Sequence, residues 1–425
     1  MPPAHTGAPV ISGASTLSFP APEPRSPGRP GYRRMSLALF AAGLATFALL
    51  YSTQALLPAV SADFGVTAGQ ASWTVSAATG ALALFVLPLS ALSERFGRTR
   101  MMTWSMVIAV ALGLLVPFAP NLEWLIVLRA VQGAAIAGIP ASAMAYLAEE
   151  VQPKALVAAI GLFVAGNSIG GMSGRIVTGW AAQAWGWRAG LLTVGLMSLA
   201  CAVAFLVLLP RARFFRPASL NPRAVGRTVA GHLRDPLLLR LYGIGALFMT
   251  VFGAVYTVVG FRLVDEFSLG QGVVGSVFLV YLVGTVSSAA AGRLVARAGR
   301  RGALYLAVTT TALGLLLSLA HSLAAILAGL VLITAGFFAG HAVASAAVSR
   351  TAKSGRAQAS ALYQSAYYLG SSAGGTLGAL AYHSSGWAAT VGIALLAVLG
   401  VVSITLYGSH AARSERRPMA AAAAR

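Results

Sequence analysis

Long apolar segments alternate with short polar segments along most of this chain. Each apolar block holds roughly twenty residues, the length that an α-helix needs to cross about 30 Å of hydrocarbon. The pattern predicts twelve membrane-spanning helices, at about 36–57, 72–92, 101–118, 123–145, 156–178, 188–209, 239–261, 272–292, 302–320, 323–346, 358–381 and 387–407. We therefore expect an all-α membrane protein.

Two patterns recur about half a chain apart. The loop sequence at Ser90–Arg100 returns in degenerate form at Gly292–Arg301, 202 positions later, and each copy lies between two long apolar segments. A glycine pattern at 166, 170, 171 and 174 returns 204 positions later at 370, 374, 375 and 378. Agreement of two unrelated patterns on nearly one offset indicates a duplicated membrane protein, because transporters are often built from such repeats.

These patterns divide the chain into five parts. We expect a disordered cytoplasmic tail at 1–34, a six-helix half at 35–209, a cytoplasmic central loop at 210–238, a second six-helix half at 239–407 and a cytoplasmic tail at 408–425. The first tail is proline-rich and has no central apolar stretch, so it does not read as a cleavable signal. The central loop is rich in arginine and proline and is compatible with a short helix along the membrane surface.

Composition and charge support the membrane assignment. The chain is 57% hydrophobic and only 9% charged, whereas a soluble domain has about 25% charged residues. Its net charge of +20 would fit a nucleic-acid partner, but 26 of the 30 lysines and arginines fall on one side if both termini lie there. This asymmetry predicts cytoplasmic termini and argues against nucleic acid. The single cysteine, Cys201, excludes internal disulfides and cysteine metal sites.

The repeated loop resembles a signature of the major facilitator superfamily. Its first copy carries the matching residues Ser90, Leu92, Glu94, Arg95, Gly97 and Arg98. The second copy keeps Gly299 and Arg300 but has Ala296 in place of the acid, and Arg129, Gln132 and Gly133 are similar to the R-x-x-q-G motif of helix 4. The resemblance covers about 36–407. It implies the major facilitator fold, with twelve helices in two pseudo-symmetric halves.

The glycine-rich fifth helix is similar to the antiporter motif of the twelve-span drug:proton antiporters, with Gly170–Gly171 in place of the usual Gly-Pro. The strings at 166–175 and 367–376 look most like the YnfM-like branch of bacterial inner-membrane transporters. The likeness implies proton-driven efflux of a small organic compound across the bacterial inner membrane. It implies no cofactor, and we expect a monomer whose partners are the substrate, the proton and the lipid bilayer.

The first loop copy is the candidate gate. Glu94 lies at a helix end among Arg95 and Arg98, and Gly97 permits a tight turn. The resemblance implies that this loop latches the two halves in the outward-facing state through charge-assisted hydrogen bonds. Gly299 and Arg300 of the second copy are further candidates for the gate. The alternative is that the arginines only anchor the topology, which we favour for the arginines of the second copy because it lacks the acid.

Arg129, Arg175 and His341 lie within predicted spans and are candidates for substrate binding or coupling. Arg129 has Leu332 as its repeat counterpart, so the architecture does not require a charge there, and intramembrane charges usually mark pathways. Arg175 lies nearer the outer surface, where snorkelling competes more strongly. His341 carries an imidazole, a group whose ordinary pKa is near neutral, and a hydrogen-bonded packing histidine is the alternative.

Further candidates come from the helices that line the cavity of this fold and from the acids. The polar and aromatic lining candidates are Tyr51, Gln54, Gln132, Tyr256, Phe337, Phe338, Tyr363 and Tyr367, each equally compatible with packing. None of the ten acids lies mid-span, which leaves Asp63, Asp265, Glu149–Glu150 and His341 for proton coupling. Arginines without an acid favour a neutral or anionic substrate.

We predict a secondary transporter that alternates access by rocking its two halves and exports a small organic compound in exchange for protons. Uniport or import is the main alternative. A substrate-sensing receptor on a transporter scaffold is a second one. A membrane-embedded enzyme is disfavoured because acids, metal ligands and nucleophiles do not cluster, and no phosphate-binding G-x-x-x-x-G-K-[ST] loop supports ATP-driven pumping.

Overall fold

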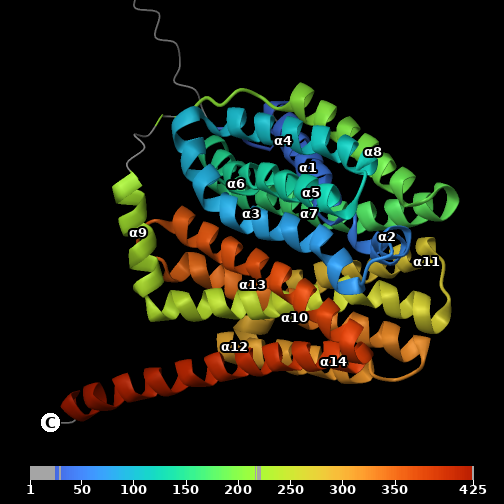
Figure 1. Ribbon diagram of the computed structural model, residues 1–425. Helices are drawn as coiled ribbons and strands as arrows, with labels where there is room; N and C mark the ends of the chain where they lie inside the picture. Colours follow the sequence, from blue (N-terminus) through green and yellow to red (C-terminus); the bar gives the residue numbers. More distant parts are fainter. Residues whose placement is uncertain (1–23, 28–29, 216, 218–221, 424–425) are drawn as a thin grey trace, which may run out of the picture.

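The computed structural model describes residues 24–27, 30–215, 217 and 222–423, which form a bundle of long helices (Figure 1). The first half contains α1 (Pro30–Tyr51), η1 (Gln54–Leu56), α2 (Leu57–Phe64), α3 (Ala68–Phe96), α4 (Arg98–Leu115), η2 (Val116–Phe118), α5 (Leu122–Ile136), α6 (Gly138–Glu150), α7 (Pro153–Trp185) and α8 (Trp187–Leu208). After α9 (Pro222–Arg234), the second half contains α10 (Pro236–Phe267), α11 (Gln271–Ser276), η3 (Val277–Val280), α12 (Tyr281–Leu317), α13 (Leu323–Thr351) and α14 (Arg356–Ala423).

The two halves lie side by side, and the bundle has two distinct ends (Figure 1). One end carries α9 and the C-terminal end of α14, and we call it the α9 end. The opposite end carries α2 and α11, and we call it the α2 end. The described residues just before α1 and the segment that follows α8 also reach the α9 end, so the start of α1 and the end of α14 lie on the same side of the bundle.

Among the described residues, ten helical segments are long and apolar enough to cross a membrane, and two of them are too long for one crossing. A 47-residue segment and a 52-residue segment would each extend roughly 70 Å or more as straight helices. The first leaves helical geometry at Gly299 and the second at Ser385–Gly386. Beyond the second break, the Thr390 hydroxyl donates to the Gly378 carbonyl at 2.9 Å, so the chain has reversed direction. Division at these breaks is consistent with twelve spans.

Both repeated sequence patterns occupy equivalent places in the two halves. Gly97 (φ +105°) and Gly299 (φ +68°) each form the turn between two helices, in a region of φ that favours glycine. The glycines of α7 face α1, where a Cβ on Gly170 would lie 2.2 Å from the Leu44 carbonyl oxygen. The glycines of α14 face α10 in the same way, with Gly374 equally close to Thr250. The rows therefore allow close helix packing in each half.

The ends of the chain differ from the expected boundaries. Helix α1 begins at Pro30, and the described residue Arg25 is buried, so ordered structure starts inside the tail expected at 1–34. Residues 1–23 lie outside the described residues. Helix α14 continues to Ala423 through most of the tail expected at 408–425. The central loop contains the 13-residue helix α9, in agreement with the surface helix allowed for that loop.

Candidate functional site

A cavity of about 590 Å³ lies between the two halves. Its walls come from α1, α6 and α7 on one side and from α10, α12, α13 and α14 on the other. On α7 the lining runs from Arg175 to Gly161, towards the helix start at the α9 end. The lining residues that carry the argument below are Tyr51, Arg175, Phe252, Tyr281, Phe337, His341, Tyr363 and Tyr367.

Hydrogen bonds between the two halves close the bundle on the α2 side of this cavity. The Trp180 indole nitrogen donates to the Ser276 hydroxyl at 2.9 Å, and the Gly272 amide donates to the Gln183 side chain at the same distance. Closer to the cavity, Ser76 accepts from Ser372 at 2.8 Å and from Thr376 at 2.9 Å, and Gln54 donates to Thr257 at 3.3 Å. The cavity therefore extends towards the α9 end.

Arg175 lies at the closed end of the cavity with 2% of its surface exposed. Its Nε and Nη2 donate to the Gln54 side-chain oxygen at 2.8 and 2.6 Å, and Nη1 donates to the Gly171 carbonyl. The guanidinium carbon is 4.4 Å from the Tyr51 ring centre, 4.6 Å from that of Phe278 and 5.0 Å from that of Tyr281, which is cation–π geometry. Among the described residues no carboxylate forms an ion pair with it, so dipoles and rings alone stabilise this charge.

A wall of aromatic rings connects Arg175 to His341. Tyr281 lies 5.3 Å from Phe252, and Phe252 stacks on Phe337 with ring centres 4.0 Å apart. Phe337 in turn stacks on the His341 imidazole at 6.0 Å. The Nδ1 of His341 is 2.9 Å from the Tyr363 hydroxyl, which fixes one ring nitrogen. The predicted cavity residue His341 is therefore part of the cavity wall.

Arg129 does not line the cavity, contrary to the role that we expected for it. It is fully buried within the first half, where Nε donates to the Thr74 carbonyl at 3.1 Å and Nη1 to the Leu49 carbonyl at 2.7 Å. It also donates to the Leu50 carbonyl and to the Gln132 side chain. Helix α1 ends at Tyr51, and the last carbonyls of a helix lack partners within it. Arg129 donates to two of them, the carbonyls of Leu49 and Leu50.

Three other predicted residues are not part of the cavity lining. Gln132 holds Arg129 and donates to the Ala109 carbonyl at 3.0 Å. Tyr256 donates to the Leu330 carbonyl at 3.3 Å, which ties α10 to α13. Asp63 accepts from Arg188 at 2.8 Å and from the Trp187 indole at 3.1 Å, at the α2 end. The structure thus brings Tyr51, Gln54 and Arg175 together and places His341 on the same cavity wall. Tyr256 packs behind that wall, with its ring centre 4.4 Å from that of Phe252. Arg129, Gln132 and Asp63 lie elsewhere.

The candidate gate residues pair within their own half. Arg98 lies 3.8 Å from Glu94, and its Nε donates to Glu149 at 3.1 Å. Arg98 also donates to the Ser93 hydroxyl at 2.6 Å, while the Arg95 guanidinium lies over the Phe96 ring. In the described part of the chain, Glu94 forms no ion pair with the second half. This arrangement fits a conformation in which the α9 end is open.

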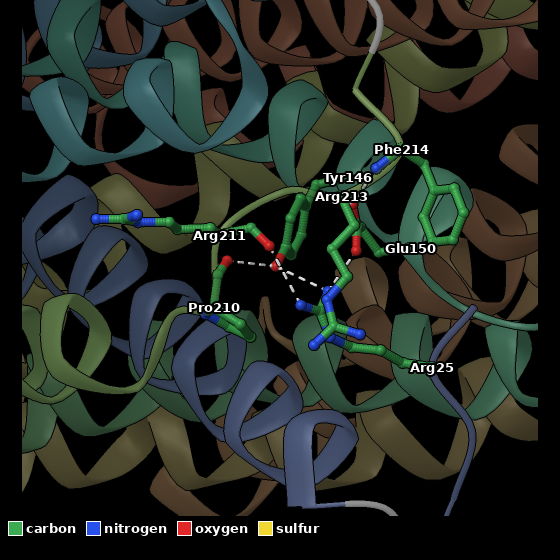
Figure 2. A network of polar contacts seen from close by, with 7 residues as sticks. All are labelled: Arg25, Tyr146, Glu150, Pro210, Arg211, Arg213 and Phe214. Carbon is green, nitrogen blue, oxygen red and sulfur yellow. Dashed lines mark hydrogen bonds and ion pairs between the residues drawn. The ribbon is translucent and has the colours of Figure 1, made fainter. Parts of the chain in front are cut away.

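A buried ion pair at the α9 end was not predicted (Figure 2). Arg25 forms an ion pair with Glu150, whose side chain is fully buried. The Nη2 of Arg25 also donates to the Arg211 carbonyl at 3.2 Å. Glu150 also accepts from the backbone amides of Arg213 and Phe214 (Figure 2). The segment before α1 and the segment after α8 therefore converge on the end of α6. The sequence signal that could have indicated this pair is the two adjacent acids, Glu149 and Glu150, because each needs a cationic partner when it is buried.

Comparison with known proteins decides the family. The family model described as Major Facilitator Superfamily matches residues 35–337 and 244–424. The chain belongs to the major facilitator superfamily. It is 39% identical over 392 residues to YybF of Bacillus subtilis, an MFS-type transporter, with coverage of 92% of this chain and 96% of YybF. It is also 39% identical over 361 residues to the inner membrane transport protein YnfM of Escherichia coli, with coverage of 85% and 87%.

The fold agrees with this family. A crystal structure of a bacterial homolog of the human lysosomal transporter Spinster, in an inward-facing and occupied conformation, matches with a TM-score of 0.72 and covers 91% of this chain and 97% of that one. Its 15% identity makes this a likeness of fold alone. The predicted family and fold class are confirmed, and the protein is a multi-pass membrane transporter.

Several cavity residues were missed from the sequence, and Phe252 and Tyr281 are two of them. Tyr281, Thr285 and Ser288 all line the cavity from α12. They are spaced by four and three residues, which places them on one helix face. Hydroxyl-bearing side chains at helical spacing within an otherwise apolar span were the signal that could have identified this face.

Proposed function

We propose that this transporter exports a small organic compound in exchange for protons, by alternating access of the central cavity. One observation carries the proposal: the cavity lies between two pseudo-symmetric halves, and the hydrogen bonds that close it are on the α2 side. Rocking of one half against the other would break those bonds and close the α9 end instead. The charges that the sequence concentrates on one side support a cytoplasmic α9 end, which makes this conformation inward-facing.

The latch formed by Glu94 and Arg98 fits the same cycle. In the present conformation both side chains pair within the first half. Closure of the α9 end would bring the loop at Gly97 towards the second half and offer Glu94 new hydrogen-bond donors. We therefore propose that Glu94 stabilises the outward-facing state, and that the substrate binds in the cavity and not at Glu94.

His341 is the group that we assign to proton coupling. It lines the cavity, and imidazole is the side chain that ordinarily titrates near neutral pH. Uniport or import is the second candidate, and one observation favours it: among the described residues that line the cavity there is no aspartate or glutamate. An antiporter commonly uses such a carboxylate to make proton and substrate compete.

The test is transport in proteoliposomes with an imposed pH gradient and a panel of small organic compounds. We expect substrate movement against its gradient when protons flow the other way, and loss of that coupling in His341→Gln. Substrate movement that only equilibrates, with no response to the pH gradient, would contradict proton coupling and support uniport.

A further inference from the structure

The strongest unexplained feature of the cavity is the buried charge of Arg175. Transfer of a charge out of water is costly unless an opposite charge compensates for it. Arg175 is 98% buried, and the described part of the chain gives it an amide oxygen, a carbonyl oxygen and three rings, but no carboxylate. Its surroundings stabilise the guanidinium without neutralising it.

The donor inventory of Arg175 leaves room for a ligand. A guanidinium has five N–H groups. Three of them donate to Gln54 and Gly171 in the described structure, which leaves two for a further acceptor at the cavity wall. Gln54 also donates to Thr257 of the second half, so the residue that orients Arg175 belongs to the contacts that must break when access changes.

From this geometry we infer that the cavity takes an amphiphilic organic anion, such as an aromatic carboxylate, with its negative group on Arg175 and its apolar body along the rings of Phe252 and Phe337. A planar fork of N–H donors matches the two oxygens of a carboxylate. Both rings line the cavity beside it and make this part of the wall apolar. A volume of about 590 Å³ lies within the range of sites that bind small molecules. The unpaired ring nitrogen of His341 lies farther along the same wall.

This inference rests on the proposed function only in taking the cavity as the transport site. It concerns binding at equilibrium and requires no gradient. A protein that binds anions selectively but does not respond to protons would refute the coupling and leave the inference standing. A proton-driven transporter that binds its ligands without charge preference would refute the inference and leave the coupling standing.

The experiment compares three probes that share one bicyclic body: 2-naphthoate, 2-naphthamide and 2-naphthylmethylammonium. Binding to the full-length chain in lipid nanodiscs is measured by equilibrium dialysis. We expect naphthoate to bind about ten- to one-hundredfold more tightly than the amide, the range for a hydrogen bond to a charged group. The ammonium probe should bind most weakly.

Arg175→Gln should lower naphthoate affinity to that of naphthamide and leave naphthamide affinity within a few fold. The matched control is Arg188→Gln, which removes an arginine at the α2 end that pairs with Asp63 outside the cavity, and it should keep the full preference. The rank order in the unmodified protein tests the inference even if Arg175→Gln does not fold. Equal binding of the three probes, preference for the ammonium probe, absence of naphthoate binding, or an unchanged preference in Arg175→Gln would each overturn it.

Discussion

Replacement of Arg129 by lysine tests whether this buried arginine is structural. The arginine makes four contacts, to the carbonyls of Leu49, Leu50 and Thr74 and to Gln132. A single ammonium cannot reach acceptors that are spread around a planar fork, so we expect loss of at least two of the four. At about 1.5 kcal/mol for each hydrogen bond to a charged group, the cost is about 3 kcal/mol.

The assay for Arg129→Lys is thermal unfolding of the purified protein. With an unfolding entropy of about 2.1 cal/mol/K per residue, a loss of 3 kcal/mol lowers Tm by about 3 °C if the whole chain unfolds together and by about 8 °C if the first half unfolds alone. Naphthoate binding by the folded protein should change less than about threefold. The control, Arg188→Lys, alters a half-exposed ion pair worth about 1 kcal/mol or less and should barely shift Tm. Unchanged Tm with lost binding would refute a structural role.

Three further predictions concern topology, the gate and the ion pair at the α9 end. In intact cells and a cysteine-free background, an impermeant maleimide should label Ser384→Cys but not Arg227→Cys, and the reverse pattern would invert the topology. Glu94→Gln should reduce transport about tenfold or more without changing cavity binding, because Glu94 pairs only within its own half here; normal transport would show that the loop only anchors topology. Arg25→Ala should cost about 3–5 kcal/mol, because it leaves buried Glu150 without its cation; addition of Glu150→Gln should recover part of the lost Tm, and no recovery would contradict the pairing.

Much of the architecture follows from the sequence because a bilayer imposes simple rules. Apolar blocks of fixed length predict the spans, and the glycines at 97 and 299 predict turns that the structure confirms at positive φ. The predicted span at 36–57 passed over the break between α1 and η1, because the three polar residues Ser52, Thr53 and Gln54 are too short a run to end an apolar block of about twenty residues. The carbonyls of Leu49 and Leu50 lie at that break, and Arg129 donates hydrogen bonds to both.

The candidate site was harder to predict, because helix rotation decides which side chains face the cavity. Arg129 and Arg175 are both arginines within apolar spans. The sequence does not give the rotation of each helix about its axis, so it does not tell which arginine binds backbone carbonyls and which one faces the cavity. That rotation is set by contacts between helices, such as those of the α7 glycines with α1. His341 and Tyr51 were predicted as cavity residues, and both line the cavity. The pair of Arg25 and Glu150 could not be predicted, because the two residues are 125 positions apart in the sequence.

The central claim, that transport requires the α2 side to open, is tested most directly by a reversible cross-link. The hydroxyl oxygens of Ser76 and Thr376 lie 2.9 Å apart across the two halves, so Ser76→Cys with Thr376→Cys, in a Cys201→Ser background, should form a disulfide without backbone movement. We predict that oxidation abolishes transport, that reduction restores it, and that naphthoate still binds to the cross-linked protein. Full transport by the oxidised, cross-linked protein would contradict alternating access through this cavity.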